Sequence, residues 1–187
     1  MLRADFRVFL DACVLANYKV CDLLLCLAER PRQFSPHWSQ EVLKETHRTQ
    51  VNKLKWPTKL ADHFRDQVTQ TFPEGCIYGF EHIIAGLQNH PKDRHVLAAA
   101  LHGHCNLILT FNLKDFRPEH LQPHGISACH PQDYLLVLYE MDAKQVISRV
   151  AAIAAKRGLS ELDLLINLGK ALPHFSSRLI DELGLVP

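Results

Sequence analysis

The chain has 187 residues, of which 47% are hydrophobic, and a formal net charge of +1 at pH 7. This length suits one domain, or one domain with an extension, and the balanced charge excludes a global electrostatic attraction to nucleic acid or membranes. No apolar run approaches the roughly 20 residues that span a bilayer, and the N-terminal segment MLRADFRVFL lacks the features of a signal peptide. We therefore expect a globular, cytoplasmic protein that does not bind membranes.

The cysteine and histidine patterns give little support for structural zinc or disulfide bonds. None of the six cysteines forms a C-x-x-C pair, and most lie within apolar stretches, as expected of reduced and mostly buried thiols. The twelve histidines show no H-E-x-x-H spacing. The cysteines are Cys13, Cys21, Cys26, Cys76, Cys105 and Cys129.

The first predicted elements are a strand, an acidic residue and a helix. The apolar run FRVFL at residues 6–10 suits a buried central strand, and Asp11 follows at its carboxyl end. Residues 14–29 then show apolar side chains at helical spacing, and Pro31 ends that helix. Asp11 has two interpretations at this point, as the N-cap of the helix or as a functional carboxylate.

Strands and helices alternate along most of the remaining chain. Periodicity, caps and prolines predict strands at residues 33–35, 76–78, 107–110 and 126–128, the last an edge strand, and helices at 39–51, 58–71, 80–87 and 93–103. A helix is expected from residue 131 to about residue 148 or beyond, with a break near Met141. Helical segments at 151–156, 160–172 and 173–183 follow without a strand pattern. This alternation predicts a parallel, doubly wound α/β sheet followed by a group of helices.

Four acidic residues are placed to meet at the carboxyl edge of that sheet. Asp11 ends the first strand, Asp93 begins a helix, and Asp115 follows a later strand, while Glu45 lies on a helix that packs against the sheet. Close carboxylates repel one another unless a cation neutralises them, and oxygen ligands without cysteine or histidine favour Mg²⁺ or Mn²⁺. Such an ion is typical of phosphoryl-transfer chemistry. Each acid also has a structural interpretation, as a helix cap, a surface residue or a turn residue.

Several segments, taken in order, resemble a bacterial PIN domain of the VapC-like toxin group: FLDACVL…DLLLCLAE, WSQEVLKET, PKDRHVLAAALHGHCNLILTFNLKDF and HGISACHPQDYLL. The resemblance extends over about residues 6–138 and is most specific in the DRHVLAAA and TFNLKDF motifs. It implies a three-layer α/β/α fold with a central parallel sheet of about five strands. We therefore assign residues 1–138 to a PIN-like domain and residues 139–187 to a helical C-terminal extension.

The resemblance also implies an Mg²⁺- or Mn²⁺-dependent endoribonuclease, usually the toxin of a type II toxin–antitoxin pair. The partners it implies are an RNA substrate and a cognate antitoxin protein, and we expect a homodimer. Thr110 and Asn112 would orient water or a metal-bound group by hydrogen bonding, and Glu41 is the alternative to Glu45, one helical turn earlier. The metal ligands implied by position within the motifs are Asp11, Glu45, Asp93 and Asp115.

Asn112 departs from the pattern of the family. Many PIN domains have an acid two residues after the threonine, where this chain has Asn112, so the resemblance leaves Asp115 to supply the carboxylate, directly or through water. Because asparagine is a neutral ligand, one or two metal ions remain possible. Four basic residues either contact RNA phosphates or are surface cations: Arg48, Arg94, Lys114 and Arg117.

Two other functional classes remain open. A catalytically weak PIN module that binds RNA or a partner protein is compatible with Asn112 in place of an acid. An aspartyl-phosphate enzyme or a receiver domain also has an aspartate after its first strand. Phosphatases of that kind usually have a second aspartate two residues on, where this chain has Cys13, and receiver domains need a lysine where it has Thr110. The metal-dependent ribonuclease is therefore the favoured interpretation.

Overall fold

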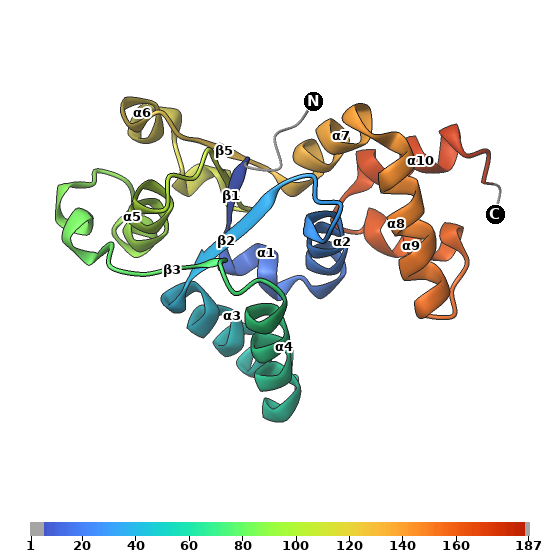
Figure 1. Cartoon of the computed structure of the whole chain (residues 1–187), viewed down its shortest axis with the longest axis horizontal. Helices are drawn as coiled ribbons and strands as arrows, with labels where there is room; N and C mark the ends of the chain where they lie inside the picture. Colours follow the sequence, from blue (N-terminus) through green and yellow to red (C-terminus); the bar gives the residue numbers. More distant parts are fainter. Residues whose placement is uncertain (1–5, 186–187) are drawn as a thin grey trace.

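The computed structural model describes residues 6–185, so the outermost parts of the two predicted regions, residues 1–5 and 186–187, lie outside the described residues. A five-stranded sheet forms its centre, with strand order β3-β2-β1-β4-β5 and every neighbouring pair parallel (Figure 1). The strands are β1 Arg7–Leu10, β2 Ser35–Ser39, β3 Cys76–Ile77, β4 Leu107–Leu109 and β5 Ser127–Cys129. The predicted α/β fold with about five parallel strands is therefore confirmed.

Helices cover both faces of the sheet and complete a three-layer arrangement. The chain moves outward from β1 through β2 to β3, then crosses back to β4 and continues to β5. Because parallel crossovers are right-handed, this reversal places α1–α4 on one face and α5 with α6 on the other (Figure 1). The helices up to β5 are α1 Ala12–Ala16, α2 Tyr18–Ala28, α3 Gln40–Asn52, α4 Thr58–Thr71, α5 Arg94–His102 and α6 Pro118–Leu121, with short 3-10 helices η1 Glu81–Gly86, η2 Pro91–Asp93, η3 Leu113–Asp115 and η4 Gln122–His124.

Three helices lie where the sequence predicts them. The Ser39 hydroxyl accepts a hydrogen bond from the Val42 N–H at 3.2 Å and thereby caps the start of α3. Helix α4 has the predicted bounds. Helix α5 ends before Gly103, where a side chain would collide with Ile77 of β3. Glycine is therefore needed at this position for close packing between α5 and the sheet.

The second strand lies further along the chain than the predicted residues 33–35, because a proline obscures its pattern. β2 contains Pro36, which has no N–H to donate to a neighbouring strand. The Ser35 N–H donates to the Phe6 carbonyl on the β1 side, and the Trp38 N–H donates to the Gly75 carbonyl on the β3 side, both at 2.9 Å. Pro36 faces the β3 side before the two-residue β3 begins, so its missing donor leaves no gap in the sheet.

The predicted helix at residues 14–29 is two helices, α1 and α2, separated by Asn17. The backbone of Asn17 has φ −79° and ψ 83°, outside the helical region, and its carbonyl accepts a hydrogen bond from the Cys21 N–H at 2.8 Å as α2 begins. Asn17 is the N-cap residue of α2, a position that favours asparagine, although its side chain makes no capping hydrogen bond here. The apolar spacing continues across this break, which is why periodicity alone predicts one helix.

Four helices follow β5: α7 Pro131–Met141, α8 Ala143–Lys156, α9 Glu161–Gly169 and α10 Pro173–Glu182. The predicted break near Met141 is confirmed, and Asp142 caps α8 by accepting from the Gln145 N–H at 3.0 Å. Helix α8 packs against α2, where Arg157 Nη2 lies 2.6 Å from Asp22 Oδ2 (Figure 1). Buried residues of these helices join the hydrophobic core of the sheet. Their assignment to a separate extension stays a prediction.

All six cysteines of the sequence are free thiols; Cys21 and Cys105 are buried, and the other four are partly exposed. Burial raises the pKa of the Cys105 thiol to about 12, so it stays protonated at neutral pH. Within residues 6–185, no helix is both long enough and apolar enough to cross a membrane.

Candidate active site

A cavity of about 420 Å³ opens at the carboxyl edge of the sheet, where β1 and β4 lie side by side. The strand order reverses at this point, and open α/β sheets bind their ligands at such positions. The cavity, called the acid cavity below, brings together three of the four predicted metal ligands and the predicted asparagine: Asp11, Glu45, Asp93 and Asn112. Its other lining residues are Ala12, Cys13, Arg48, Thr49, Asn52 and Lys53, of which the sequence predicts only Arg48 as a site residue.

Three hydrogen bonds hold the carboxylate of Asp11. Oδ1 accepts from the Ala12 N–H at 2.7 Å, and Oδ2 accepts from the Thr110 hydroxyl at 2.7 Å and from the Cys13 thiol at 3.0 Å. Only 7% of Asp11 is exposed, and it follows the three fully buried residues 8–10 of β1. Asp11 thus caps α1 and also lines the cavity, so its two interpretations from sequence are compatible.

Thr110 acts on Asp11 and on the loop that follows β4. Its hydroxyl donates to Asp11 and accepts from the Asn112 N–H at 3.0 Å, and the residue is fully buried. Asn112 is exposed and lines the cavity, whereas Thr110 does not. Thr110 therefore orients a carboxylate and a loop, and does not itself reach the open space of the cavity.

Cys13 is a site residue that sequence patterns do not reveal. Burial, together with the charge and hydrogen bond of Asp11, raises the pKa of the Cys13 thiol to about 12. The protonated thiol is therefore a donor to Asp11, and its sulfur also accepts from the Phe111 N–H at 3.3 Å. Its only sequence signal is its position two residues after Asp11.

Asp93 occupies the N-cap position of α5 without capping it, since its side chain accepts no hydrogen bond from that helix. Its Oδ2 lies 3.2 Å from Nδ1 of His90 instead. Burial raises the pKa of Asp93, and the nearby charges of Asp115 and Asp11 raise it further. Asp115 does not line the cavity, but its charge reaches Asp93. The expected repulsion between carboxylates is therefore present here.

Glu45 lines the acid cavity, whereas Glu41 does not. Glu45 Oε1 lies 3.4 Å from Nε2 of His95, and Glu41 Oε2 lies 3.4 Å from Nζ of Lys44. Burial acts to lower the pKa of His95, but the hydrogen bond to Glu45 and the charges of Glu45, Glu41 and Asp11 outweigh it and raise the pKa. His95, which does not itself line the acid cavity, is therefore a favourable electrostatic partner of Glu45.

The oxygen donors of the acid cavity suit a hard divalent cation. Three carboxylates and one amide line the cavity. Burial raises the pKa of Asp93, and repulsion from two nearby aspartates raises it further; a bound cation would relieve that repulsion. In the described part of the chain, no three His, Cys, Asp or Glu side chains are arranged to hold an ion as they stand. Two of the acids contact histidines, Asp93 with His90 and Glu45 with His95. The donor chemistry thus fits Mg²⁺ or Mn²⁺.

The predicted phosphate-binding residues fall into two groups. Arg48 lines the acid cavity, and Lys53 lines it beside Arg48. Arg94, Lys114 and Arg117 do not line it. Arg94 Nε donates to the Asn89 carbonyl at 3.1 Å, and Arg117 lies 3.7 Å from Glu119. The positive charge next to the acids therefore comes from α3 and the residue that follows it.

Comparison with known proteins finds a relative that is similar over part of the chain. No protein-family model and no solved structure matches the chain. Over 104 residues the chain is 39% identical to a Mycobacterium tuberculosis protein named "Putative ribonuclease VapC50". The match covers 54% of this chain and 62% of that protein, so the chain spans less than two thirds of the length of its relative. Over about half of its own length, this chain is thus similar to a protein that carries the name of a ribonuclease.

Proposed function

We propose that the chain is a Mg²⁺- or Mn²⁺-dependent endoribonuclease that hydrolyses RNA phosphodiester bonds. The observation that carries this proposal is the meeting of Asp11, Glu45 and Asp93, from three separate parts of the chain, in one cavity at the switch point of the sheet. Arg48 and Lys53 add positive charge for RNA phosphates on the same wall. The resemblance to PIN domains and the similarity to a protein named as a ribonuclease support the same conclusion.

The residues of the cavity have distinct roles in this proposal. Asp11, Glu45 and Asp93 would hold the cation, with Asn112 as a neutral ligand. When bound, the cation supplies charge that stabilises the phosphate oxygens and lowers the pKa of a water molecule. Arg48 binds a phosphate next to the acids. The oxygen of a water molecule bonds to phosphorus while the ester P–O bond breaks, and the departing oxygen takes up a proton, so no side-chain nucleophile is needed.

Dependence on a divalent cation tests the proposal. After treatment with EDTA the full chain is expected to leave labelled single-stranded RNA intact, and adding Mn²⁺ or Mg²⁺ should restore cleavage. The products, separated on a denaturing gel, report the rate at each concentration of metal. Cleavage that continues in excess EDTA would contradict the assignment of the carboxylates to a metal site.

A catalytically weak module that binds RNA or a partner protein is the second candidate. Two observations favour it: Asn112 replaces an acid, and the described residues contain no preformed group of three ligands. The same titration separates the candidates, because tight binding of Mn²⁺ without RNA cleavage would favour the module.

We further propose that this enzyme is the toxin of a toxin–antitoxin pair and acts as a homodimer, with a cognate antitoxin as its protein partner. The support is the resemblance of the DRHVLAAA and TFNLKDF motifs to VapC-like toxins. Expression of the chain alone is expected to arrest bacterial growth, and the product of an adjacent short gene should relieve the arrest. Normal growth at high levels of active protein would count against a toxin.

A further inference from the structure

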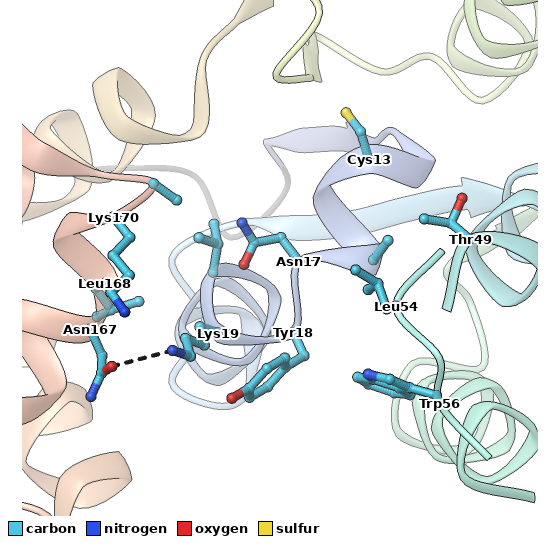
Figure 2. Close-up of a pocket in the computed structure, with 13 residues that line it drawn as sticks. Cys13, Asn17, Tyr18, Lys19, Thr49, Leu54, Trp56, Asn167, Leu168 and Lys170 are labelled. Carbon is cyan, nitrogen blue, oxygen red and sulfur yellow. Dashed lines mark hydrogen bonds between the residues drawn. The ribbon is translucent and has the colours of Figure 1, made fainter. Parts of the chain in front are cut away.

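A second cavity, of about 650 Å³, lies next to the acid cavity and shares Cys13 and Thr49 with it. We call it the aromatic cavity. It is bounded by the turn between α1 and α2, by the loop after α3 and by helix α9 (Figure 2). Its volume lies in the range of roughly 300–1,000 Å³ that is usual for sites holding a small ligand. Because the two cavities share Cys13 and Thr49, a polymer bound across the carboxylates would continue into the aromatic cavity.

Two aromatic side chains, Tyr18 and Trp56, line the aromatic cavity. Figure 2 shows Tyr18 and Trp56 directed toward the same space, and their ring centroids lie 6.0 Å apart with 61° between the planes. Phe64 packs edge to face against the indole of Trp56, with 6.2 Å between the ring centroids. Tyr18 is 44% exposed. Accessible aromatic rings next to a cationic groove are the usual platform for nucleobases, because every base has a face that can stack.

The charge of the aromatic cavity suits an anionic ligand. Lys19 and Lys170 line it, and none of its lining residues is acidic. Nζ of Lys19 donates one hydrogen bond to Oδ1 of Asn167 at 3.3 Å, which leaves two of its three donors for a phosphate. The neighbouring cavity between α2 and α4 is lined by two acids, Asp22 and Glu29, and by Arg157, which pairs with Asp22. A polyanion leaving the carboxylates is therefore attracted to the aromatic cavity, which has two lysines and no acid.

We propose that the aromatic cavity binds the nucleotide of single-stranded RNA that lies next to the cleaved phosphodiester. Its base packs against Trp56 and Tyr18, and its phosphate is bound by Lys19 and Lys170. Because Lys170 follows α9, the helices after β5 contribute directly to the RNA groove. This inference rests on the proposed ribonuclease function, and a bound peptide segment is the competing occupant.

Tryptophan fluorescence tests the inference without any need for cleavage. The chain has two tryptophans, and Trp38 is fully buried, so RNA in the aromatic cavity can quench only Trp56. The full chain is titrated with a short single-stranded oligouridylate in EDTA, where no cleavage is expected. We expect quenching that saturates together with binding, measured by fluorescence anisotropy of the labelled oligouridylate. Trp56→Phe should abolish the quenching, and Trp56→Ala should weaken binding by about 5- to 100-fold.

A matched pair of lysine variants tests the role of the C-terminal helices. Lys170→Ala should weaken binding and reduce the slope of log affinity against log salt by about one, as expected for the loss of one phosphate contact. Lys144→Ala removes an exposed lysine of α8 that does not line the aromatic cavity, so it should leave affinity and slope unchanged. Equal effects of the two substitutions would overturn the inference.

The outcomes separate this inference from the proposed function. If the wild-type chain binds and cleaves RNA but Trp56 fluorescence does not change at saturation, the ribonuclease stands and the inference is wrong. Quenching by an unrelated basic or amphipathic peptide, with none by the oligouridylate, would assign the cavity to a protein partner and overturn it. A chain that neither binds nor cleaves RNA would overturn both proposals.

Discussion

Asp93→Asn is expected to reduce RNA cleavage by at least about a hundredfold while leaving the protein folded. Asparagine keeps the size of the side chain but removes the negative charge that would hold a divalent cation. A metal ion contributes several kcal/mol to transition-state stabilisation, and each ~1.4 kcal/mol corresponds to a factor of ten in rate. The rate of RNA cleavage at saturating Mn²⁺, compared between variant and parent, measures the effect.

The stability of Asp93→Asn should not fall together with its activity. Burial and the charges of Asp115 and Asp11 raise the pKa of Asp93, so its ionised form is disfavoured in the folded protein. Removing that charge should leave the melting temperature unchanged or slightly higher. Asp181→Asn, at an exposed position on α10, is the matched control and should retain full activity. Parent-level cleavage by Asp93→Asn would show that the metal assignment is wrong.

Trp38→Ala is expected to destabilise the protein by about 3–5 kcal/mol, which is a large part of the stability of an ordinary domain. Trp38 is fully buried on β2 and packs edge to face against Phe72, with 6.1 Å between the ring centroids. Gly75 leaves room for the indole, since a Cβ there would lie 2.9 Å from its ring. Loss of the ring would leave a cavity between β2 and the end of α4, and the surrounding chain can fill it only partly.

Chemical denaturation followed by far-ultraviolet circular dichroism measures this change in the free energy of unfolding. Trp38→Phe should cost less, because it keeps an aromatic ring against Phe72. Trp56→Ala, at a half-buried position, should also cost clearly less than Trp38→Ala. If Trp38→Ala and Trp56→Ala lower the free energy of unfolding equally, burial of Trp38 does not explain its contribution to stability.

Local patterns in the sequence were sufficient to predict most of the fold. Ser39 marks the start of α3, and the apolar runs before Asp11 and Thr110 are the two central strands. These features depend on neighbours along the chain, which is why capping and periodicity detect them. The sequence pattern predicts β2 too early in the chain, because Pro36 resembles a loop residue. The continuous apolar spacing of α1 and α2 hides the break at Asn17.

The alternation of strands and helices, the acids at strand ends and the order of the motifs can all be read along the chain. Which side chains meet in a cavity depends instead on how the elements pack. This packing places Glu45, and not Glu41, in the acid cavity, adds Cys13 as a donor to Asp11, and brings α9 next to the loop after α3. The reason is physical: these contacts join residues far apart in the chain, and the packing of helices onto the sheet sets their distances.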